Sequence, residues 1–161
     1  QLYETLDYPD SAIVAYQQVL DLNRRVPREL WIHARLAQLK NNLPKDEDTH
    51  KAYKKLLRSD EDRRFRDKTH YFYGAYLLKE EDTINAEKEL TASLETDTQD
   101  RYLKSLIYEQ FSSNRIDQLA FVIAGAYLDS TLLNLSDGTR RYRKLKRQRD
   151  KLDDILSLIH I

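Results

Sequence analysis

Four histidines are the residues of this sequence best suited to metal binding or proton transfer: His33, His50, His70 and His160. Both kinds of chemistry need partners at a short spacing, as in the His-Glu-x-x-His motif, and none of the four has one. The chain contains no cysteine, which excludes thiol nucleophiles, disulfides and cysteine-rich zinc sites. We therefore predict a non-enzymatic protein without catalytic residues, metal site or cofactor, and interpret His70 as a hydrogen-bonded core residue.

Glycines and acidic clusters give no stronger indication of a site. Gly74 and Gly125 lie inside helical patterns rather than in a phosphate-binding loop, so helix packing is the preferred explanation. The acidic runs 46–48 and 80–82 lack EF-hand spacing and a central glycine. We interpret them as solvated loops that precede helices. The pair Arg66–Asp67, at a predicted helix start, has either a local structural role or a bridging role between repeats.

A run of basic residues near the C-terminus is the strongest charge pattern. Eight fall within twelve positions: Arg140, Arg141, Arg143, Lys144, Lys146, Arg147, Arg149 and Lys151. Contact with nucleic acid is one interpretation of this run, and it gives the alternative function of a nucleic-acid-associated helical protein. Because 27 basic and 27 acidic residues balance over the whole chain, general affinity for nucleic acid is not expected.

The same segment carries an apolar seam at spacings of three and four. It consists of Tyr142, Leu145, Arg149, Leu152, Leu156 and Ile159. A seam of this kind favours a capping helix that packs on the preceding helices and keeps its basic residues in solvent. Pairing of the seam with another chain is a third interpretation.

Long helices are the elements that this sequence favours. It has only three glycines and three prolines, too few for the turns of a sandwich, a barrel or a βαβ array, and its apolar residues recur every three or four positions. Caps and breaks place the predicted helices at Ser11–Asn23, Arg28–Asn42, Asp48–Leu57, Ser59 or Asp60 to Glu80, Thr83–Thr96, Asp100–Ser112, Asp117–Leu135 and Thr139–Leu158. The sequence therefore predicts an all-α protein.

Small residues recur along the chain at a regular distance. Ala86 follows Gly74 by twelve positions, and Ala52 and Ala120 lie thirty-four residues before and after Ala86. The first repeat is lengthened by about six residues at the Leu43–Asp48 loop. Small residues at such positions let paired helices approach closely. The pattern resembles the tetratricopeptide repeat (TPR).

This resemblance implies a right-handed α-solenoid of antiparallel helix pairs. We expect a single domain over residues 1–161, with three or four helix pairs and a charged terminal helix over residues 139–158. His70 takes the place of the family's tryptophan, and Leu77 that of its tyrosine. The family's inner positions would then line a concave groove that binds other proteins or peptides.

The groove positions implied by the resemblance fall on two helices. They are Lys68, Tyr71, Ala75 and Leu78 in the third repeat, and Tyr102, Ser105 and Glu109 in the fourth. Tyrosine suits a binding surface because its rigid ring gives a large contact area at a small entropic cost. A place in the core between repeats is the alternative for Tyr71 and Tyr102.

Two stretches resemble a narrower group, the TPR lipoproteins of Bacteroidota linked to type IX secretion and gliding motility. They are Tyr53–Gly74, in which an Arg-Asp pair precedes a tyrosine-rich helix, and Ala126–Leu132, with its Tyr-Leu-Asp-Ser motif. The resemblance implies a fragment of a longer protein that is anchored by an N-terminal lipid and located in the periplasm or at the outer membrane. Without it we expect a cytoplasmic protein. No stretch approaches the about 20 apolar residues of a transmembrane helix.

Overall fold

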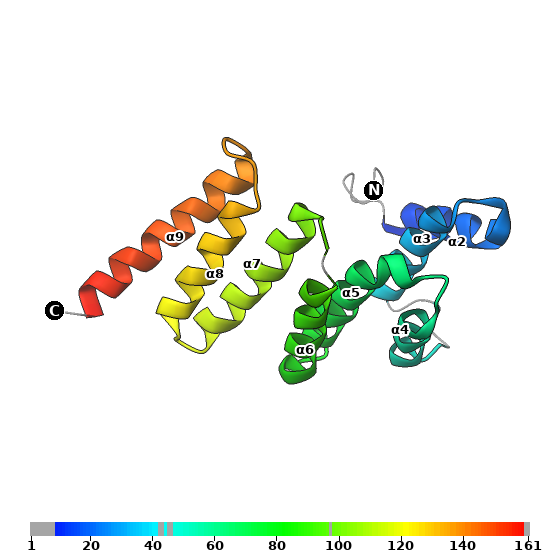
Figure 1. The fold of residues 1–161 in the computed structure, drawn as a ribbon, viewed down its shortest axis with the longest axis horizontal. Helices are drawn as coiled ribbons and strands as arrows, with labels where there is room; N and C mark the ends of the chain where they lie inside the picture. Colours follow the sequence, from blue (N-terminus) through cyan, green and yellow to red (C-terminus); the bar gives the residue numbers. More distant parts are fainter. Residues whose placement is uncertain (1–8, 42–43, 45–46, 97, 160–161) are drawn as a thin grey trace. The chain divides into compact units, whose positions relative to one another are not determined.

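The computed structural model describes residues 9–41, 44, 47–96 and 98–159 (Figure 1). Within these ranges every regular element is a helix, which confirms the all-α prediction. The α-helices are α2 (Pro9–Leu22), α3 (Arg28–Lys40), α4 (Thr49–Arg58), α5 (Arg66–Lys79), α6 (Thr83–Glu95), α7 (Arg101–Asp117), α8 (Phe121–Leu133) and α9 (Arg140–Ile159). Two short 3-10 helices, η1 (Asn23–Arg25) and η2 (Arg63–Phe65), precede α3 and α5.

The predicted helix boundaries fail at two places. The boundary between α7 and α8 was expected at Ser112 and Asp117, but α7 continues through Asp117 and α8 begins at Phe121. The turn between them places Leu119 at a φ of 59°, in the left-handed region. Glycine usually occupies such a position, so the sequence gave no turn signal there. The helix expected from Ser59 or Asp60 instead begins at Arg66, after a turn and η2.

The chain divides into two compact units, Gln1–Ser93 and Leu94–Ile161. The arrangement of helices within each unit is described below. The expectation of one repeat domain over residues 1–161 stays a prediction.

In the first unit α3 and α5 run parallel to each other. Three contacts between the two segments follow the same order along both. The Arg28 guanidinium binds Asp62 just before η2, His33 lies beside Lys68, and Lys79 donates to the carbonyl of Lys40. Helix α4 runs antiparallel to α5, since Tyr53 stacks on Tyr73 at a centroid distance of 5.0 Å while His50 meets Tyr76 edge to face.

The core of this unit joins four helices. Its buried side chains are Ile32, Leu36 and Leu39 of α3, Ala52, Tyr53 and Leu56 of α4, Phe65 of η2, Tyr73, Tyr76 and Leu77 of α5, and Ala86 of α6. The tyrosines that are so common in the sequence are therefore partly core residues. Because several contribute large rings, α4 and α5 are held together mainly by aromatic contacts.

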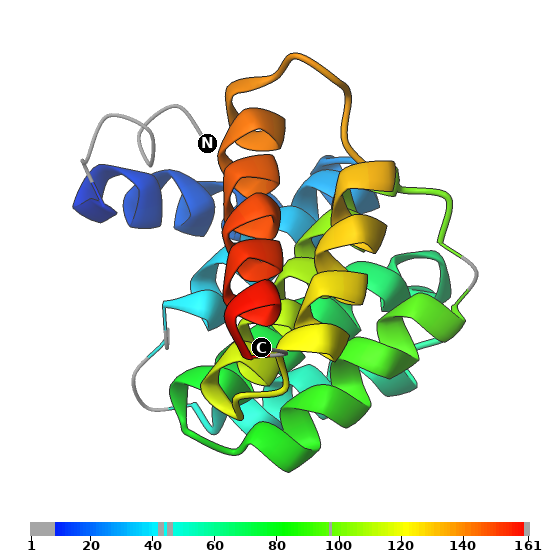
Figure 2. The same cartoon turned by 90° about the vertical axis from the view of Figure 1, so that its left-hand side faces the viewer.

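In the second unit α8 lies between α7 and α9. Tyr127 of α8 contacts Phe111 of α7 at a centroid distance of 5.2 Å. On its other side, α8 contributes Leu128 to a core that includes Leu145 and Leu152 of α9. Figures 1 and 2 show α8 and α9 side by side. The predicted seam of the last helix is confirmed at these two leucines, so α9 packs on the preceding helix of its own chain.

The hairpins α5–α6 and α7–α8 share the same turn. Glu81 and Leu119 both adopt the left-handed conformation, with φ of 61° and 59°. The next residue in each turn donates from its backbone to a carbonyl five residues earlier, Asp82 to Leu77 at 3.0 Å and Ala120 to Arg115 at 2.8 Å. These are the bonds of a Schellman motif, which ends a helix and directs the chain into the next one. The two turns lie 38 residues apart.

The expected equivalence of Ala120 with Ala86 is wrong. Ala120 is the N-cap of α8 and is only half-buried, whereas Ala124 is fully buried like Ala86. Twelve residues before Ala124 stands Ser112, whose hydroxyl donates to the Ala124 carbonyl at 2.9 Å. Ser112 and Ala124 thus correspond to Gly74 and Ala86. The offset is 38 residues rather than 34, which is one additional helical turn.

The other small residues of the repeat occupy the expected place. Ala12, Ala52, Ala86 and Ala124 are each the fourth residue of their helix, in α2, α4, α6 and α8, and each is buried. A side chain larger than alanine at such a position would separate the helix from its neighbour. Close helix approach near the start of every second helix is therefore a repeated feature of this chain.

Candidate partner-binding groove

A groove of about 410 Å³ opens on the first unit between α2, α3 and α5. Its lining is formed by Tyr16 of α2, by Glu29, Leu30, His33, Ala37 and Lys40 of α3, and by Phe72 of α5. The α3 residues recur at spacings of three and four, so one face of that helix forms the floor. The volume falls within the about 300–1,000 Å³ typical of ligand pockets.

The middle of the groove is apolar. Leu30 leaves 53% of its surface exposed, although it lies in the middle of a folded unit. Phe72 is half-buried, packs against the core of the unit and contacts Tyr71 edge to face at 5.4 Å. Because Phe72 is fixed by the core, its free face is a rigid apolar surface for a partner.

Polar groups mark the two ends of the groove. At one end, Nε2 of His33 lies 3.5 Å from Nζ of Lys68 and 3.8 Å from a carboxylate oxygen of Glu29. Burial, followed by the positive charge of Lys68, holds the pKa of His33 below its usual value, and the opposing effect of Glu29 is smaller. His33 is therefore neutral at pH 7. At the other end, exposed Lys40 closes the groove.

The sequence-predicted groove residues of α5 fall into two groups. Lys68 lies at the rim beside His33, and Tyr71 is half-buried against Phe72. Ala75 is half-buried, and Leu78 packs against the core, so it supports the unit rather than facing a partner. The prediction thus found the helix and its rim but missed Phe72, the residue that lines the groove.

The α3 residues of the groove were also missed. Leu30, His33 and Ala37 form a three-four stripe that the sequence analysis assigned partly to the helix interior. A search for positions of α3 equivalent to those proposed on α5 could have found this face. The six-residue lengthening of the first repeat obscured that correspondence.

In the second unit the predicted groove residues have different surroundings. Tyr102 is 58% exposed and lies under the guanidinium of Arg141, 5.0 Å from its ring centroid. The same Arg141 forms an ion pair with Glu109. Ser105 is fully buried, and its hydroxyl donates to the Tyr102 carbonyl at 2.7 Å. The prediction that Ser105 faces a groove is therefore wrong.

The error at Ser105 follows from the assumed period. A 34-residue shift carries Tyr71 onto Ser105, whereas the observed 38-residue shift carries it onto Glu109. Ser105 lies seven residues before Ser112, on the side of α7 that packs against α8. By the corrected shift, Leu106 and Ser113 replace Tyr102 and Glu109 as equivalents of Lys68 and Ala75.

A second pocket of the first unit, of about 400 Å³, lies between α2, α3 and α4. Its charges are paired with one another. Arg28 binds both carboxylate oxygens of Asp62, at 2.7 and 2.8 Å, and Arg35 forms an ion pair with Glu47. Because these groups satisfy each other, we interpret this pocket as structural.

The remaining histidines of the described ranges have local partners. Nδ1 of His70 lies 2.7 Å from the Glu89 carboxylate, and Nδ1 of His50 lies 3.1 Å from the Tyr73 hydroxyl. His160 lies outside the described residues. The bridging role considered for Arg66–Asp67 belongs instead to Arg28 and Asp62, since Arg66 contacts only exposed Asp60, at 3.8 Å.

Comparison of the sequence with known protein families and with curated proteins finds no match in either. Among the described helices, none has the length and apolar character needed to cross a bilayer. The interpretation of this chain therefore depends on its own residues and on the geometry of its helices.

Proposed function

We propose that the protein is a non-enzymatic scaffold, a right-handed TPR-like α-solenoid that binds a segment of another protein in the groove between α2, α3 and α5. The observation that carries this proposal is the exposed apolar floor between two parallel helices, formed by Leu30 and Phe72. The repeated hairpin turns and the buried alanines support the repeat architecture. Helical repeats commonly use such surfaces to bind peptides.

The groove favours a particular kind of segment. Apolar side chains would pack on Leu30, Ala37 and Phe72, and a carboxylate would be favoured beside Lys40. At the opposite end, Glu29 and neutral His33 would accept hydrogen bonds from a donor group of the partner. A short segment with an apolar centre and polar ends therefore fits better than a uniformly charged one.

Selection of peptides from a random displayed library on the purified chain tests this proposal. We expect a selected peptide to bind Leu30→Asp and Phe72→Ala at least tenfold more weakly, as measured by fluorescence anisotropy. Ile84→Asp is the matched control, because Ile84 is a 72% exposed apolar residue of α6 outside the groove. Its affinity should stay within twofold of the unmodified protein.

Thermal unfolding of each variant separates loss of binding from loss of the fold. A peptide that binds Leu30→Asp and the unmodified chain equally would exclude the groove as its site. Tyr71→Ala should weaken binding less than Phe72→Ala, since Tyr71 supports the Phe72 ring from the side.

On the resemblance alone, we extend the proposal to a lipid-anchored component of a type IX secretion or gliding machine. Two tests apply to this extension. A signal peptide that ends in a cysteine, encoded upstream of Gln1, would support it. An uninterrupted cytoplasmic reading frame there would remove it and leave the scaffold proposal unchanged.

A further inference from the structure

The basic residues of α9 divide into a paired and an unpaired group. Arg141 pairs with Glu109, Lys146 lies 3.7 Å from Asp150, and Arg149 binds Asp129 at 2.9 Å. Five others are exposed and have no ion-pair or hydrogen-bond partner among the described residues: Arg140, Arg143, Lys144, Arg147 and Lys151. The fold of the second unit therefore uses three of the eight cations and leaves five in solvent.

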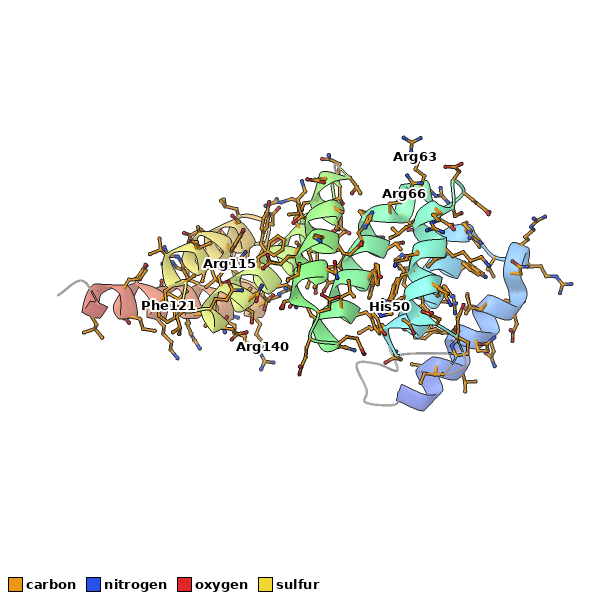
Figure 3. All side chains as sticks on the ribbon, turned by 90° about the horizontal axis from the view of Figure 1, so that it is seen from below. His50, Arg63, Arg66, Arg115, Phe121 and Arg140 are labelled. Atoms are coloured by element: carbon orange, nitrogen blue, oxygen red, sulfur yellow. The ribbon has the colours of Figure 1, made fainter. Side chains whose placement is uncertain are left out.

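Most of the unpaired cations form one stripe. Arg140, Lys144, Arg147 and Lys151 follow one another at spacings of four, three and four residues, which places them on one face of α9. This face lies opposite the seam of Leu145 and Leu152, the two buried leucines that pack on α8. Figure 3 shows Arg140 pointing away from the ribbon.

The stripe ends in apolar residues. Ile155 and Leu158 continue the same face at the next three-four spacings, and they are 39% and 71% exposed. From Arg140 to Leu158 the surface extends about 27 Å, at a rise of 1.5 Å per residue. Like charges at these spacings repel each other within a helix, so the arrangement does not stabilise α9 itself.

We propose that this face of α9 binds an acidic amphipathic helix of a partner protein. Carboxylates of the partner would lie opposite the four cations, and apolar side chains opposite Ile155 and Leu158. The surface is on the second unit and is distinct from the groove of the first, so this proposal goes beyond the proposed function and does not depend on it.

Two features favour an acidic helix over nucleic acid. The stripe contains no aromatic side chain on which a base could stack, whereas single-stranded nucleic acid is commonly bound by such stacking. Its exposed Ile155 and Leu158 have no counterpart in a phosphate backbone. A helix that is acidic over two or three turns and apolar over the next turn matches both parts of the surface.

A defined set of probes tests the proposal with the full chain. The first is a synthetic peptide of about 20 residues, with glutamates every three or four positions followed by two leucines at the same spacing. The second replaces those leucines with glutamine, and the third is a 20-nucleotide single strand or duplex. Fluorescence anisotropy at about 50 and 200 mM salt measures the affinity of each probe.

Variants assign the binding to the stripe. Lys144→Gln/Arg147→Gln/Lys151→Gln removes three of its charges. The control Arg24→Gln/Arg25→Gln removes two exposed basic residues of η1 in the first unit. Leu158→Ser changes only the apolar end, where the side chain is exposed, and leaves the seam intact.

The expected result is salt-sensitive binding of the leucine-containing peptide, about tenfold weaker for the triple variant and within twofold for the control. Leu158→Ser should weaken binding of that peptide and not of its glutamine version. Absence of peptide binding at 50 mM salt would overturn the proposal, as would equal losses in the triple and control variants. Tighter binding of either oligonucleotide than of the peptide would assign the surface to nucleic acid instead.

Discussion

The strongest test of the first unit is removal of the Asp62 carboxylate. Asp62 is 1% exposed, and its two oxygens accept hydrogen bonds from Arg28 at 2.7 and 2.8 Å. The pair connects the first residue of α3 to the turn before η2. Asp62→Ala removes both bonds and leaves the Arg28 guanidinium, only 26% exposed, without its main partner.

The size of the effect follows from this geometry. Removing one partner of a fully buried ion pair costs about 3–5 kcal/mol. Water reaches the exposed quarter of Arg28, and its guanidinium keeps the face of Trp31 at 4.1 Å, so the lower part of that range applies. We expect Asp62→Ala to lower the free energy of unfolding of this unit by about 3 kcal/mol.

Glu61 provides the matched control. Its carboxylate is the next one along the chain, lies 3.9 Å from Arg28 and is 70% exposed. Glu61→Ala should change the free energy of unfolding by less than about 0.5 kcal/mol. Urea denaturation followed by fluorescence measures both variants, because Trp31 is the single tryptophan of the chain and reports on this unit.

The pH dependence of the effect has a defined sign. Burial raises the pKa of Asp62, but the hydrogen bonds from Arg28 and Ser59 together outweigh it, so the pKa lies below its usual value. The stabilisation is therefore complete above the unfolded pKa of about 3.9 and is lost as the pH falls through the folded pKa. Equal losses for Asp62→Ala and Glu61→Ala at pH 7, or a difference that persists far below pH 3, would refute this reasoning.

Three further substitutions test packing and turns, each by chemical denaturation. Gly74→Ala should destabilise by about 1–2 kcal/mol, because its new Cβ would lie 2.8 Å from Leu90 Cγ, whereas Gly125→Ala, which meets only the end of the Arg149 side chain at 3.3 Å, should be neutral or stabilising. Equal effects of the two changes would contradict the helix spacing. Tyr53→Phe should be neutral or stabilise by up to about 1 kcal/mol, since the buried Tyr53 hydroxyl has no partner among the described residues, and a marked loss would reveal one. Leu119→Gly should stabilise by about 1 kcal/mol by relieving the positive φ of an exposed leucine, and a loss of stability would show that the leucine side chain contributes more than the strain costs.

Most of the fold could be predicted from the spacing of apolar residues. Periodicity identified all eight helices, and the start of α3 and that of α6 were placed at the observed residue. The seam of α9 was also predictable, since Leu145 and Leu152 are buried as its spacing requires. These features depend on local sequence, because amphipathic periodicity reports which face of a helix is covered.

The turns and the charge pairs could not be predicted in the same way. Glu81 and Leu119 occupy left-handed positions without being glycine or asparagine, so no turn signal marks them. Arg28 and Asp62 are 34 residues apart, and nothing in either segment indicates that they meet. Likewise, the pairing of Arg141 with Glu109 depends on how α7, α8 and α9 pack together.

The groove residues show why a site is harder to predict than a fold. A shift of four residues moves a position along a helix by one turn and rotates it by about 40°, at 3.6 residues per turn. An apolar stripe is at least about 100° wide, so the helix keeps the same buried face under this error and the fold prediction survives. A groove residue stands at the edge of that stripe, where 40° separates exposed Tyr102 from a covered position. Ser105 was assigned to a groove and is fully buried for this reason, whereas Glu109, reached by the corrected shift from Tyr71, keeps part of its surface in solvent.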